Sequence, residues 1–316
     1  MMAQTYPQHL FEVLVADDFS VDKTSVIVAS YANKNIRRIA LEDFILEGSI
    51  NSYKKKAIEL AISESSGELI VTTDADCILP TRWLETIASL YIEHRPAFIC
   101  APVAFTSGNN FLSIFQSLDF MTLQGITGAS VSNGFHSMCN GANLAYEKKA
   151  FYETGGFAGI DNIASGDDML LMHKIATQHP GRISYLKSQD AVVYTEPMAS
   201  IKDFLNQRIR WASKTGNYAD KKIIAVLALV YIFNVWLFLL GVLSIFYQPV
   251  LWMFILMIVG KILIELLFLY PLATFFNNKK LLWWFPLSQP FHIIYTIIAG
   301  WMGKFGSYNW KGRNVK

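Results

Sequence analysis

The chain has 316 residues, 53% of them hydrophobic and 16% charged, with 27 Lys and Arg against 25 Asp and Glu. Residues 1–222 contain 20 basic and 24 acidic side chains, whereas residues 223–316 contain 7 basic side chains and 1 acidic one. The acidic balance of the first part argues against nucleic-acid binding, and the long apolar runs of the second part exclude a wholly soluble protein. We therefore expect a soluble domain over 1–222 followed by a membrane region over 223–316.

Apolar strands and helical patterns alternate along the first part. The expected elements, in chain order, are a strand in FEVLVADDFS (11–20), a helix in 53–68, a strand at the start of 68–80, a helix in 81–94, a strand in 97–105 and an amphipathic helix in 111–125. The short run 25–32 opens either a helix or a strand. This alternation indicates an α/β fold with a mostly parallel sheet covered on both faces, whose ligands bind beyond the carboxyl ends of the strands.

Two of the expected strands end in paired acidic residues: Asp17 with Asp18, and Asp74 with Asp76. Side chains two apart on a strand point the same way, and carboxylates that close repel unless a proton or a cation lies between them. A turn explains Asp74 and Asp76 taken alone, but the second acidic strand end indicates a shared site. Oxygen ligands of this kind suit Mg²⁺ or Mn²⁺, which bridge to the phosphates of a substrate.

Two later segments of the first part carry alternatives that the sequence leaves open. The helix of 111–125 lies either in the membrane interface or against the domain core. In SGDDMLLMHKI (165–175), Ser165 can cap a helix with Asp167 or Asp168 in its first turn. Capping explains one of these acids, while a carboxylate that follows a glycine at a helix start is also well placed as a general base.

The segment DFLNQRIRWASK (203–214) precedes the first apolar run. Gln207 and Trp211 are four residues apart and share a helix face, with Arg208 and Arg210 beside them. A basic helix next to a membrane can hold lipid phosphates. A glutamine and a tryptophan in this spacing have no obvious role with lipid.

The second part contains three apolar runs, 223–247, 250–276 and 281–303. The first two are long enough to cross a ~30 Å hydrocarbon core. The third contains two prolines and reads as a kinked span or a re-entrant segment. Lys261 and Glu265 in the second run either neutralise each other within a helix bundle or face a polymer channel. We favour mutual neutralisation, and we expect two or three transmembrane helices.

Positive charge before the first run places the soluble domain in the cytosol. No apolar segment precedes residue 223, so we expect no secretory signal peptide. The uncharged loop at 247–249 then faces outward, and NNKK (277–280) returns to the cytosol. The expected location is therefore the cell (inner) membrane, with several spans and contact with membrane lipid.

Taken in order, four motifs resemble those of membrane-bound glycosyltransferases of family 2, the group that contains cellulose, chitin and hyaluronan synthases. The motifs are VADDFS (15–20), TTDADC (72–77), GDD (166–168) and QRIRW (207–211), and CNGANLAYEKKAFYETGGF (139–157) resembles the acceptor-side segment of the family. The resemblance implies a GT-A-like domain that uses a UDP-sugar and a divalent metal.

The same resemblance implies roles for the residues that bind the donor. Asp17 and Asp18 would contact the nucleoside of the UDP-sugar, and Lys54 would approach its phosphates. Asp74 would hold the ribose side, and Asp76 would bind the Mg²⁺ or Mn²⁺ that grips the diphosphate.

On the acceptor side, the resemblance implies that Asp168 deprotonates the acceptor hydroxyl, so that the anomeric configuration inverts. Gln207, Arg208, Arg210 and Trp211 would clamp the leaving diphosphate and support the acceptor sugar. The acceptor would be a polysaccharide or a lipid-linked sugar, by processive synthesis or by single transfer.

One departure from the family concerns the start of the chain. Relatives usually begin with a strand that ends in a Pro-Ala-Arg-Asn-Glu-like turn, whereas this chain begins at MMAQTYPQHLFEV. We therefore expect an N-terminal truncation that impairs donor binding. The alternative is an inactive, membrane-anchored binding or scaffold protein. A metal-dependent phosphohydrolase would need more metal ligands, usually with His among them.

Overall fold

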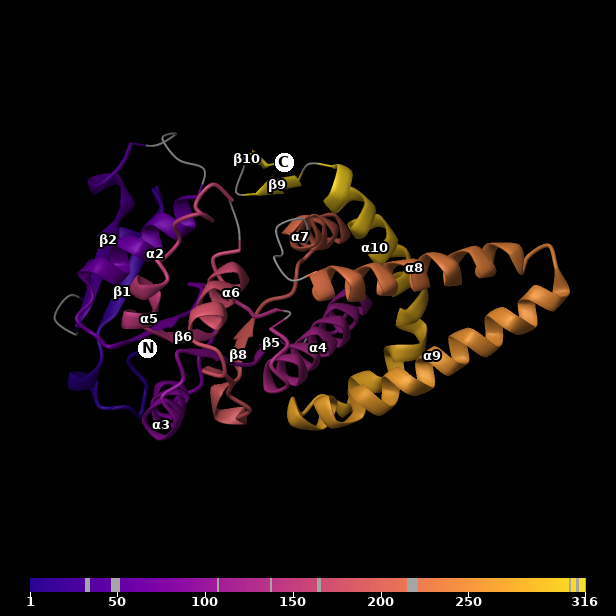
Figure 1. Ribbon diagram of the computed structural model, residues 1–316, viewed down its shortest axis with the longest axis horizontal. Coiled ribbons are helices and arrows are strands. Elements are labelled where there is room, and N and C mark those ends of the chain that lie inside the picture. The colour runs from indigo at the N-terminus through magenta and orange to yellow at the C-terminus, as the bar shows by residue number, and fades with distance from the viewer. Residues whose placement is uncertain are drawn as a thin grey trace. The chain divides into compact units, whose positions relative to one another are not determined.

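The computed structural model describes residues 1–31, 35–46, 52–106, 108–136, 138–163, 166–214, 221–306, 308–310 and 313–315 (Figure 1). The chain divides into two compact units. Unit 1 comprises 1–103 and 127–195, and unit 2 comprises 104–126 and 196–316. Parts of the expected soluble domain, 104–126 and 196–214, therefore cluster with the C-terminal helices. The strand β5 (Val103–Phe105) and the helix α4 (Phe111–Ser132) run across the boundaries between the units.

Unit 1 is an α/β unit, as the sequence predicts. Its strands are β1 (Val13–Asp17), β2 (Ile36–Ala40), β3 (Leu69–Thr72), β4 (Phe98–Cys100), β6 (Leu144–Glu147), β7 (Ile183–Tyr185) and β8 (Val193–Thr195). Its α-helices are α1 (Thr24–Ala29), α2 (Tyr53–Glu64), α3 (Trp83–His94), α5 (Lys148–Glu153) and α6 (Met169–Gln178), and its short 3₁₀ helices are η1 (Gln8–Leu10), η3 (Leu41–Asp43) and η4 (Gln189–Ala191).

Strand pairing in unit 1 is partly parallel and partly antiparallel. β1 pairs with β2 in parallel, with Val15 opposite Arg38 and Asp17 opposite Ala40. A four-stranded sheet has the order β3-β6-β4-β7, in which β4 and β7 are parallel and β6 is antiparallel to both of its neighbours. The sequence analysis did not assign β6 as a strand, and this strand makes the sheet mixed.

The core of unit 1 lies between this sheet and α3. Trp83, Ile87 and Ile99 are almost completely buried there. The indole N–H of Trp83 donates to the side-chain oxygen of Asn143 at 2.9 Å, and the amide nitrogen of Asn143 donates to two backbone carbonyls. Because its amide is fully engaged in this buried setting, Asn143 fixes the chain that leads into β6.

Three expected elements differ in detail from the structure. The run 25–32, left open between helix and strand, forms the short helix α1. The single strand expected in 97–105 is two strands, β4 and β5, separated at Pro102, which cannot donate a backbone hydrogen bond to a ladder. The strand expected at the start of 68–80 ends at Thr72, before the acidic residues that follow it.

Unit 2 is mostly helical. Besides the first part of α4, it contains α7 (Ile201–Ser213), α8 (Lys221–Leu243), α9 (Gln248–Phe275), the 3₁₀ helix η6 (Lys279–Trp284), α10 (Phe285–Phe305) and the antiparallel strands β9 (Tyr308–Trp310) and β10 (Arg313–Val315). α10 packs against α7 and α8, and α8 is followed by α9 after a short turn (Figure 1).

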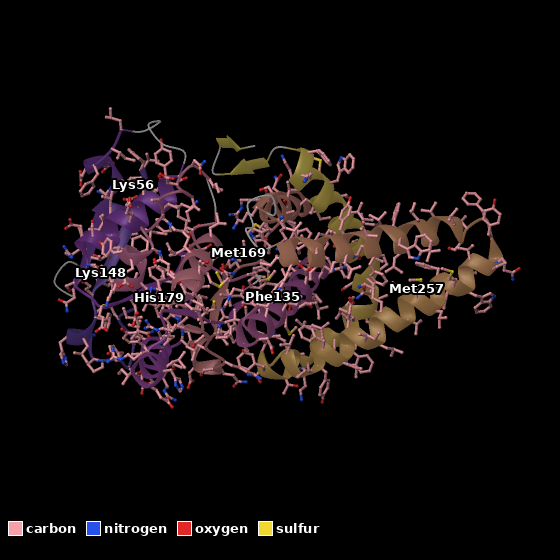
Figure 2. All side chains as sticks on the ribbon, in the orientation of Figure 1. Lys56, Phe135, Lys148, Met169, His179 and Met257 are labelled. Carbon is pink, nitrogen blue, oxygen red and sulfur yellow. The ribbon has the colours of Figure 1, made fainter. Side chains whose placement is uncertain are left out.

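Among the described helices, α8 and α9 are the two that are long and apolar enough to cross a membrane. Their large apolar side chains are widely exposed, as at Leu256 and Leu267, and Figure 2 shows side chains projecting from both sides of α9 around Met257. A helix that is apolar all round suits a lipid environment. The third run forms one helix, α10, with Pro290 inside it.

Contacts in unit 2 bear on two alternatives that the sequence left open, the role of Lys261 with Glu265 and the packing of the helix in 111–125. Lys261 Nζ lies 2.7 Å from Glu265 Oε2, which confirms their mutual neutralisation, and Gln289 from α10 donates to the same carboxylate at 2.9 Å. The apolar stripe of α4 packs within the protein: the Phe115 ring centroid lies 5.6 Å from that of Phe204.

Candidate functional site

Asp74 and Asp76 lie in a turn and not on a strand. β3 ends at Thr72, and the backbone N–H of Cys77 donates to the carbonyl of Asp74 at 3.2 Å to close the turn. The strand-face argument, which placed the two carboxylates side by side, is therefore wrong. The turn still follows the carboxyl end of a sheet strand, where ligands of α/β folds bind.

Lys54 pairs with Asp74, the first acid of this turn, and with Asp167. It occupies the first turn of α2, and its Nζ lies 3.0 Å from Asp74 Oδ1 and 3.1 Å from Asp167 Oδ2. Burial alone would lower the pKa of the Lys54 ammonium, but the carboxylates of Asp167 and Asp74 raise it well above its usual value. Lys54 therefore carries a permanent positive charge at the end of β3, and its side chain remains 31% exposed.

Asp168 faces the same cluster from the start of α6. The backbone N–H of Gly141 donates to its Oδ2 at 3.3 Å, and the N–H of Met169, the first residue of α6 (Figure 2), donates to its Oδ1 at 2.7 Å. Asp168 is thus the N-cap of α6. Ser165, the cap proposed from sequence, lies outside the described residues.

Gly141 shows how closely these groups converge. A Cβ built on it would lie 3.4 Å from Asp167 Oδ2, 3.5 Å from Lys54 Nζ and 3.6 Å from Asp168 Cβ. The Thr72 hydroxyl, at the end of β3, donates to the Gly141 carbonyl at 3.3 Å. The loop before β6 is therefore held against the cluster formed by Lys54, Asp167 and Asp168.

The glycine before the acidic pair shapes the chain there. Gly166 has φ +85°, in the left-handed region that side chains disfavour. A Cβ at this position would also lie 2.9 Å from Leu170 Cδ1. The backbone can therefore turn sharply into α6 and present both Asp167 and Asp168 to the cluster.

The VADDFS motif lies next to the start of α2. The ring centroid of Phe19 lies 5.9 Å from that of Tyr53, the residue before Lys54. Phe19 has φ +54°, and this turn brings the residues after β1 toward α2. Asp18 is half-buried in the same turn. The structure therefore brings the motif at 15–20 and the start of α2, which carries Lys54, into one region of unit 1.

Asp17 is fully buried and ion-paired. The parallel register places Arg38 of β2 diagonally across from Asp17, on the same face. Arg38 Nε lies 2.6 Å from Asp17 Oδ2, and the Ser20 N–H donates to Asp17 Oδ1 at 3.0 Å. Burial acts to raise the pKa of Asp17, but the hydrogen bonds from Ser20 and Arg38 more than offset it, so that the pKa is lowered.

Asp76 has the exposure that a metal ligand bridging to a substrate needs. Its side chain is exposed, and the Cys77 thiol donates weakly to it at 3.8 Å. Burial and the carboxylates of Asp74 and Asp76 raise the pKa of Cys77 to about 11. Mg²⁺ is usually held by one or two carboxylates together with substrate phosphates, so the exposed carboxylate of Asp76 fits such an ion. Among the described residues, no three His, Cys, Asp or Glu side chains converge to hold a metal by themselves.

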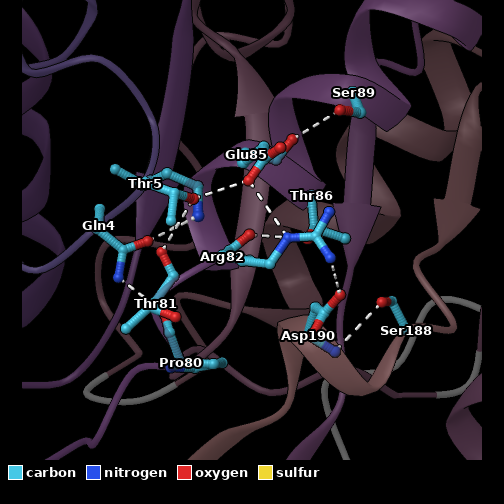
Figure 3. A network of polar contacts seen from close by, with 11 residues as sticks. Gln4, Thr5, Pro80, Thr81, Arg82, Glu85, Thr86, Ser89, Ser188 and Asp190 are labelled. Atoms are coloured by element: carbon cyan, nitrogen blue, oxygen red, sulfur yellow. Dashed lines mark hydrogen bonds and ion pairs between the residues drawn. The ribbon is translucent and has the colours of Figure 1, made fainter.

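A polar network anchors the far end of the acidic turn (Figure 3). The side-chain nitrogen of Gln4 donates to the Pro80 carbonyl at 2.7 Å, and its oxygen accepts from the Leu84 N–H at 2.9 Å. Arg82 in turn bridges to Asp190 at 2.9 Å. The N-terminal segment therefore fixes the chain between the acidic turn and α3.

The QRIRW motif lies in unit 2, on α7. Ser200 caps this helix by accepting from the Asp203 N–H at 3.1 Å. Arg208 is buried, whereas Gln207, Arg210 and Trp211 are half-buried. The structure therefore places the ten predicted site residues in two groups, six in unit 1 and four in unit 2.

Sequence reasoning missed three residues of the unit 1 site: Arg38, Gly141 and Asp167. Arg38 and Gly141 are brought in by strand pairing and by a loop, so their places depend on tertiary contacts. The one local signal was the adjacency of Asp167 to Asp168, which the sequence analysis used only for helix capping.

The family model described as glycosyl transferase family 2 matches residues 2–155. This range includes Asp17, Asp18, Lys54, Asp74 and Asp76 and ends before Asp168. It therefore covers the predicted donor residues and most of the 139–157 segment, and it does not reach Asp168 or the QRIRW motif.

Two curated proteins are similar to the chain. An N-acetylglucosaminyltransferase of Rhizobium meliloti (strain 1021) is 27% identical over 221 residues, which are 67% of this chain and 50% of that protein. The glycosyltransferase AglE of Haloferax volcanii is 26% identical over 167 residues, 53% of this chain and 51% of that protein. The chain therefore spans about half the length of the curated relatives it matches.

Solved structures of S. aureus TarS residues 1–349 are also similar. One is 18% identical with a TM-score of 0.46 and covers 99% of this chain and 89% of that chain. The complex of the same protein with UDP-GlcNAc is 17% identical with a TM-score of 0.46 and covers 99% of this chain and 90% of that chain. The match to the family model, together with the α/β architecture of unit 1, confirms the expected GT-A-like fold class. Residues 2–155 are therefore similar to glycosyltransferase domains of family 2.

Proposed function

We propose that the protein transfers a sugar from a UDP-sugar to a polysaccharide or lipid-linked acceptor at the cytosolic face of a membrane, with inversion at the anomeric carbon. The observation that carries this proposal is the cluster of Lys54, Asp74, Asp167 and Asp168 at the carboxyl end of β3. It combines a permanent cation with carboxylates at the place where ligands of α/β domains bind.

The positive charge of Lys54 suits a diphosphate leaving group. Breaking the bond between a sugar and a diphosphate requires that the developing negative charge be stabilised. Lys54 is proposed to supply one charge for the phosphates, and Arg210 keeps the diphosphate role that the family resemblance implies. A Mg²⁺ or Mn²⁺ ion held by Asp76 would add Lewis-acid stabilisation of the diphosphate. Asp17, Asp18 and Asp74 are proposed to hold the nucleoside and the ribose.

Asp168 suits the role of general base. Two backbone N–H groups fix the orientation of its carboxylate, and a base must be oriented within hydrogen-bond reach of the proton it takes. Removal of the proton from the acceptor hydroxyl on the side opposite the leaving group gives in-line attack and inversion. Gln207 and Trp211 are proposed to contact the acceptor sugar, whose C–H face packs well on an indole.

The donor to test first is UDP-GlcNAc, because a similar curated protein is named an N-acetylglucosaminyltransferase. The experiment supplies labelled UDP-GlcNAc, UDP-glucose or UDP-galactose with Mn²⁺ to the purified full chain in lipid nanodiscs. We expect label to pass to a polymer or a lipid from one of these donors. Product length then separates processive synthesis from single transfer.

Calorimetry with UDP and Mn²⁺ separates this proposal from a scaffold protein. The enzyme proposed here binds UDP more weakly when Asp76→Asn is introduced, because a ligand of the bridging cation is lost. Binding without any transfer would support a scaffold that retains the pocket. No binding of UDP to the full chain would contradict the proposal.

A further inference from the structure

Unit 2 contains a buried ion pair next to the QRIRW motif. Arg208 Nη2 lies 2.7 Å from Asp119 Oδ2 of α4, and both side chains are only 4% exposed. The Tyr295 hydroxyl of α10 donates to the other oxygen of the same carboxylate. His292 Nε2 also lies 4.0 Å from Asp119 Oδ1. Asp119 therefore joins α7 to α4 and α10.

The other side of the Arg208 guanidinium contacts the motif itself. Its Nη1 donates to Gln207 Oε1 at 3.0 Å. Its Cζ lies 4.3 Å from the centroid of the Trp211 ring and 4.7 Å from that of the Phe204 ring. One planar group thus holds the amide of Gln207 and the indole of Trp211 together, on the helix face that the two residues share.

The burial of Arg208 explains why Asp119 is needed. A buried guanidinium is unfavourable unless a charged partner and further hydrogen bonds compensate for lost hydration. Asp119 provides that partner, and Tyr295 fixes the orientation of the Asp119 carboxylate. The plane of the guanidinium, and with it the positions of Gln207 and Trp211, therefore depends on a residue of α4 outside every sequence motif.

We propose that Asp119 and Arg208 are positioning residues: Asp119 orients the Arg208 guanidinium, which holds Gln207 and Trp211 in place for the acceptor. This inference rests on the proposed function, because the positions of Gln207 and Trp211 affect catalysis only if these residues contact the acceptor. It gives Arg208 a role different from the diphosphate clamp that the sequence implied and leaves direct contact with the phosphates to Arg210.

The test uses Arg208→Lys in the full chain. A lysine keeps the charge that pairs with Asp119, but it has neither the second N–H group for Gln207 nor the planar face for Trp211. The first readout is ¹⁹F NMR of the protein labelled with 5-fluorotryptophan. The chain has eight tryptophans, and Trp211→Phe assigns the resonance of Trp211. The second readout is steady-state sugar transfer.

We expect Arg208→Lys to shift or broaden the Trp211 resonance alone. We expect it to lower kcat by about tenfold to 100-fold, as for other misplaced reactive groups, while the KM for the donor changes less than about threefold. Asp119→Asn should disturb the same resonance, since the guanidinium loses its ionic partner. The matched control is Lys261→Met, which removes the buried partner of another ion pair in unit 2. It should lower the melting temperature and leave the Trp211 resonance and kcat per folded molecule unchanged.

Two results would overturn the inference. One is an Arg208→Lys variant with the wild-type Trp211 resonance and kcat, which would make the pair purely structural. The other is an Arg208→Lys variant that loses donor affinity with an unmoved resonance, which would return Arg208 to the diphosphate. A wild-type protein without transferase activity would count against the proposed function, and the NMR measurement would still decide the contacts of Arg208.

Discussion

Single residues in unit 1 show that two of the predicted acids are paired with cations from neighbouring elements. Asp17 is paired with Arg38, and Asp74 is paired with Lys54. The two pairs differ in their surroundings, since the Asp17 side chain is fully buried whereas that of Asp74 is 43% exposed. Asp17 is therefore a structural acid as well as a candidate ligand, and Asp74 is the more accessible of the two.

The Asp17 pair predicts a pH-dependent contribution to stability. Its pKa is lowered in the folded protein, so the stabilisation is present above the unfolded value of ~3.9 and is lost as the pH falls through the lower folded value. We expect Arg38→Met to reduce the free energy of unfolding by about 2 kcal/mol at pH 7, in the range of hydrogen bonds to charged groups. Chemical unfolding followed at pH 7 and near pH 3 measures the difference.

The control for this prediction is Arg37→Met. Arg37 is 49% exposed and pairs with Glu12 at 3.1 Å, and exposed pairs contribute about 1 kcal/mol or less. The Arg38 penalty should be smaller near pH 3 than at pH 7, because the pair begins to lose its contribution below the unfolded pKa of Asp17. An Arg38→Met penalty of equal size at both pH values would contradict this electrostatic account.

The acids of the site could be predicted from sequence because they stand in short motifs. Their partners could not, because Arg38 reaches Asp17 through strand register and Lys54 reaches Asp167 across 113 positions of the sequence. Buried Asp119 carries no motif at all. Its role follows from contacts with Arg208 and Tyr295, which only the packing of α4, α7 and α10 creates.

At the level of elements, periodicity predicted most helices, and turns accounted for the differences. α2, α3, α7, α8 and α9 lie where the apolar patterns place them. The acidic turn after β3 was mistaken for a strand end because the apolar run continues past it to Leu79. β6 was missed because its segment was read only as a motif.

Close packing between α7 and α10 predicts the effect of one glycine. A Cβ on Gly303 would lie 2.7 Å from Ala212 Cβ and 3.0 Å from the backbone of Ser213. The neighbouring backbone cannot move aside easily, so we expect Gly303→Ala to cost about 1–3 kcal/mol. Thermal unfolding of the full chain in detergent, monitored by circular dichroism, measures the loss.

Gly260→Ala on α9 is the matched control, because no atom of the described residues outside the backbone of α9 and the two chain neighbours lies within 4 Å of the added Cβ. Alanine favours the helix by about 0.5–1 kcal/mol over glycine, so this variant should keep or raise the melting temperature. Equal melting temperatures for the two variants would show that α7 and α10 do not pack as described.

At the scale of the whole molecule, α8 and α9 determine how the chain would be inserted in a membrane. α8 and α9 have the length and composition of spans, and their apolar side chains are exposed. The charge distribution predicts that the turn between them faces outward and that the chain after α9 returns to the cytosol. We expect the protein to remain in the membrane pellet after carbonate extraction.

Single cysteines test this topology. With Cys77, Cys100 and Cys139 replaced by alanine, Gln248→Cys should react with a membrane-impermeant maleimide in intact cells. Asn278→Cys should react only after permeabilisation. The opposite pattern would reverse the orientation, and labelling of both sites in intact cells would contradict a pair of spanning helices.

The central claim is that the cluster at the end of β3 transfers sugar with Asp168 as the base. The most direct measurement compares kcat for transfer from UDP-GlcNAc, or from whichever donor proves active, between the wild type and Asp168→Asn. Donor affinity is measured in parallel by calorimetry. Asparagine remains a good N-cap for α6, so the fold should be retained while the proton acceptor is lost. We predict a fall in kcat of about 10²–10⁴-fold with donor affinity nearly unchanged. A variant that transfers sugar at the wild-type rate would contradict the account.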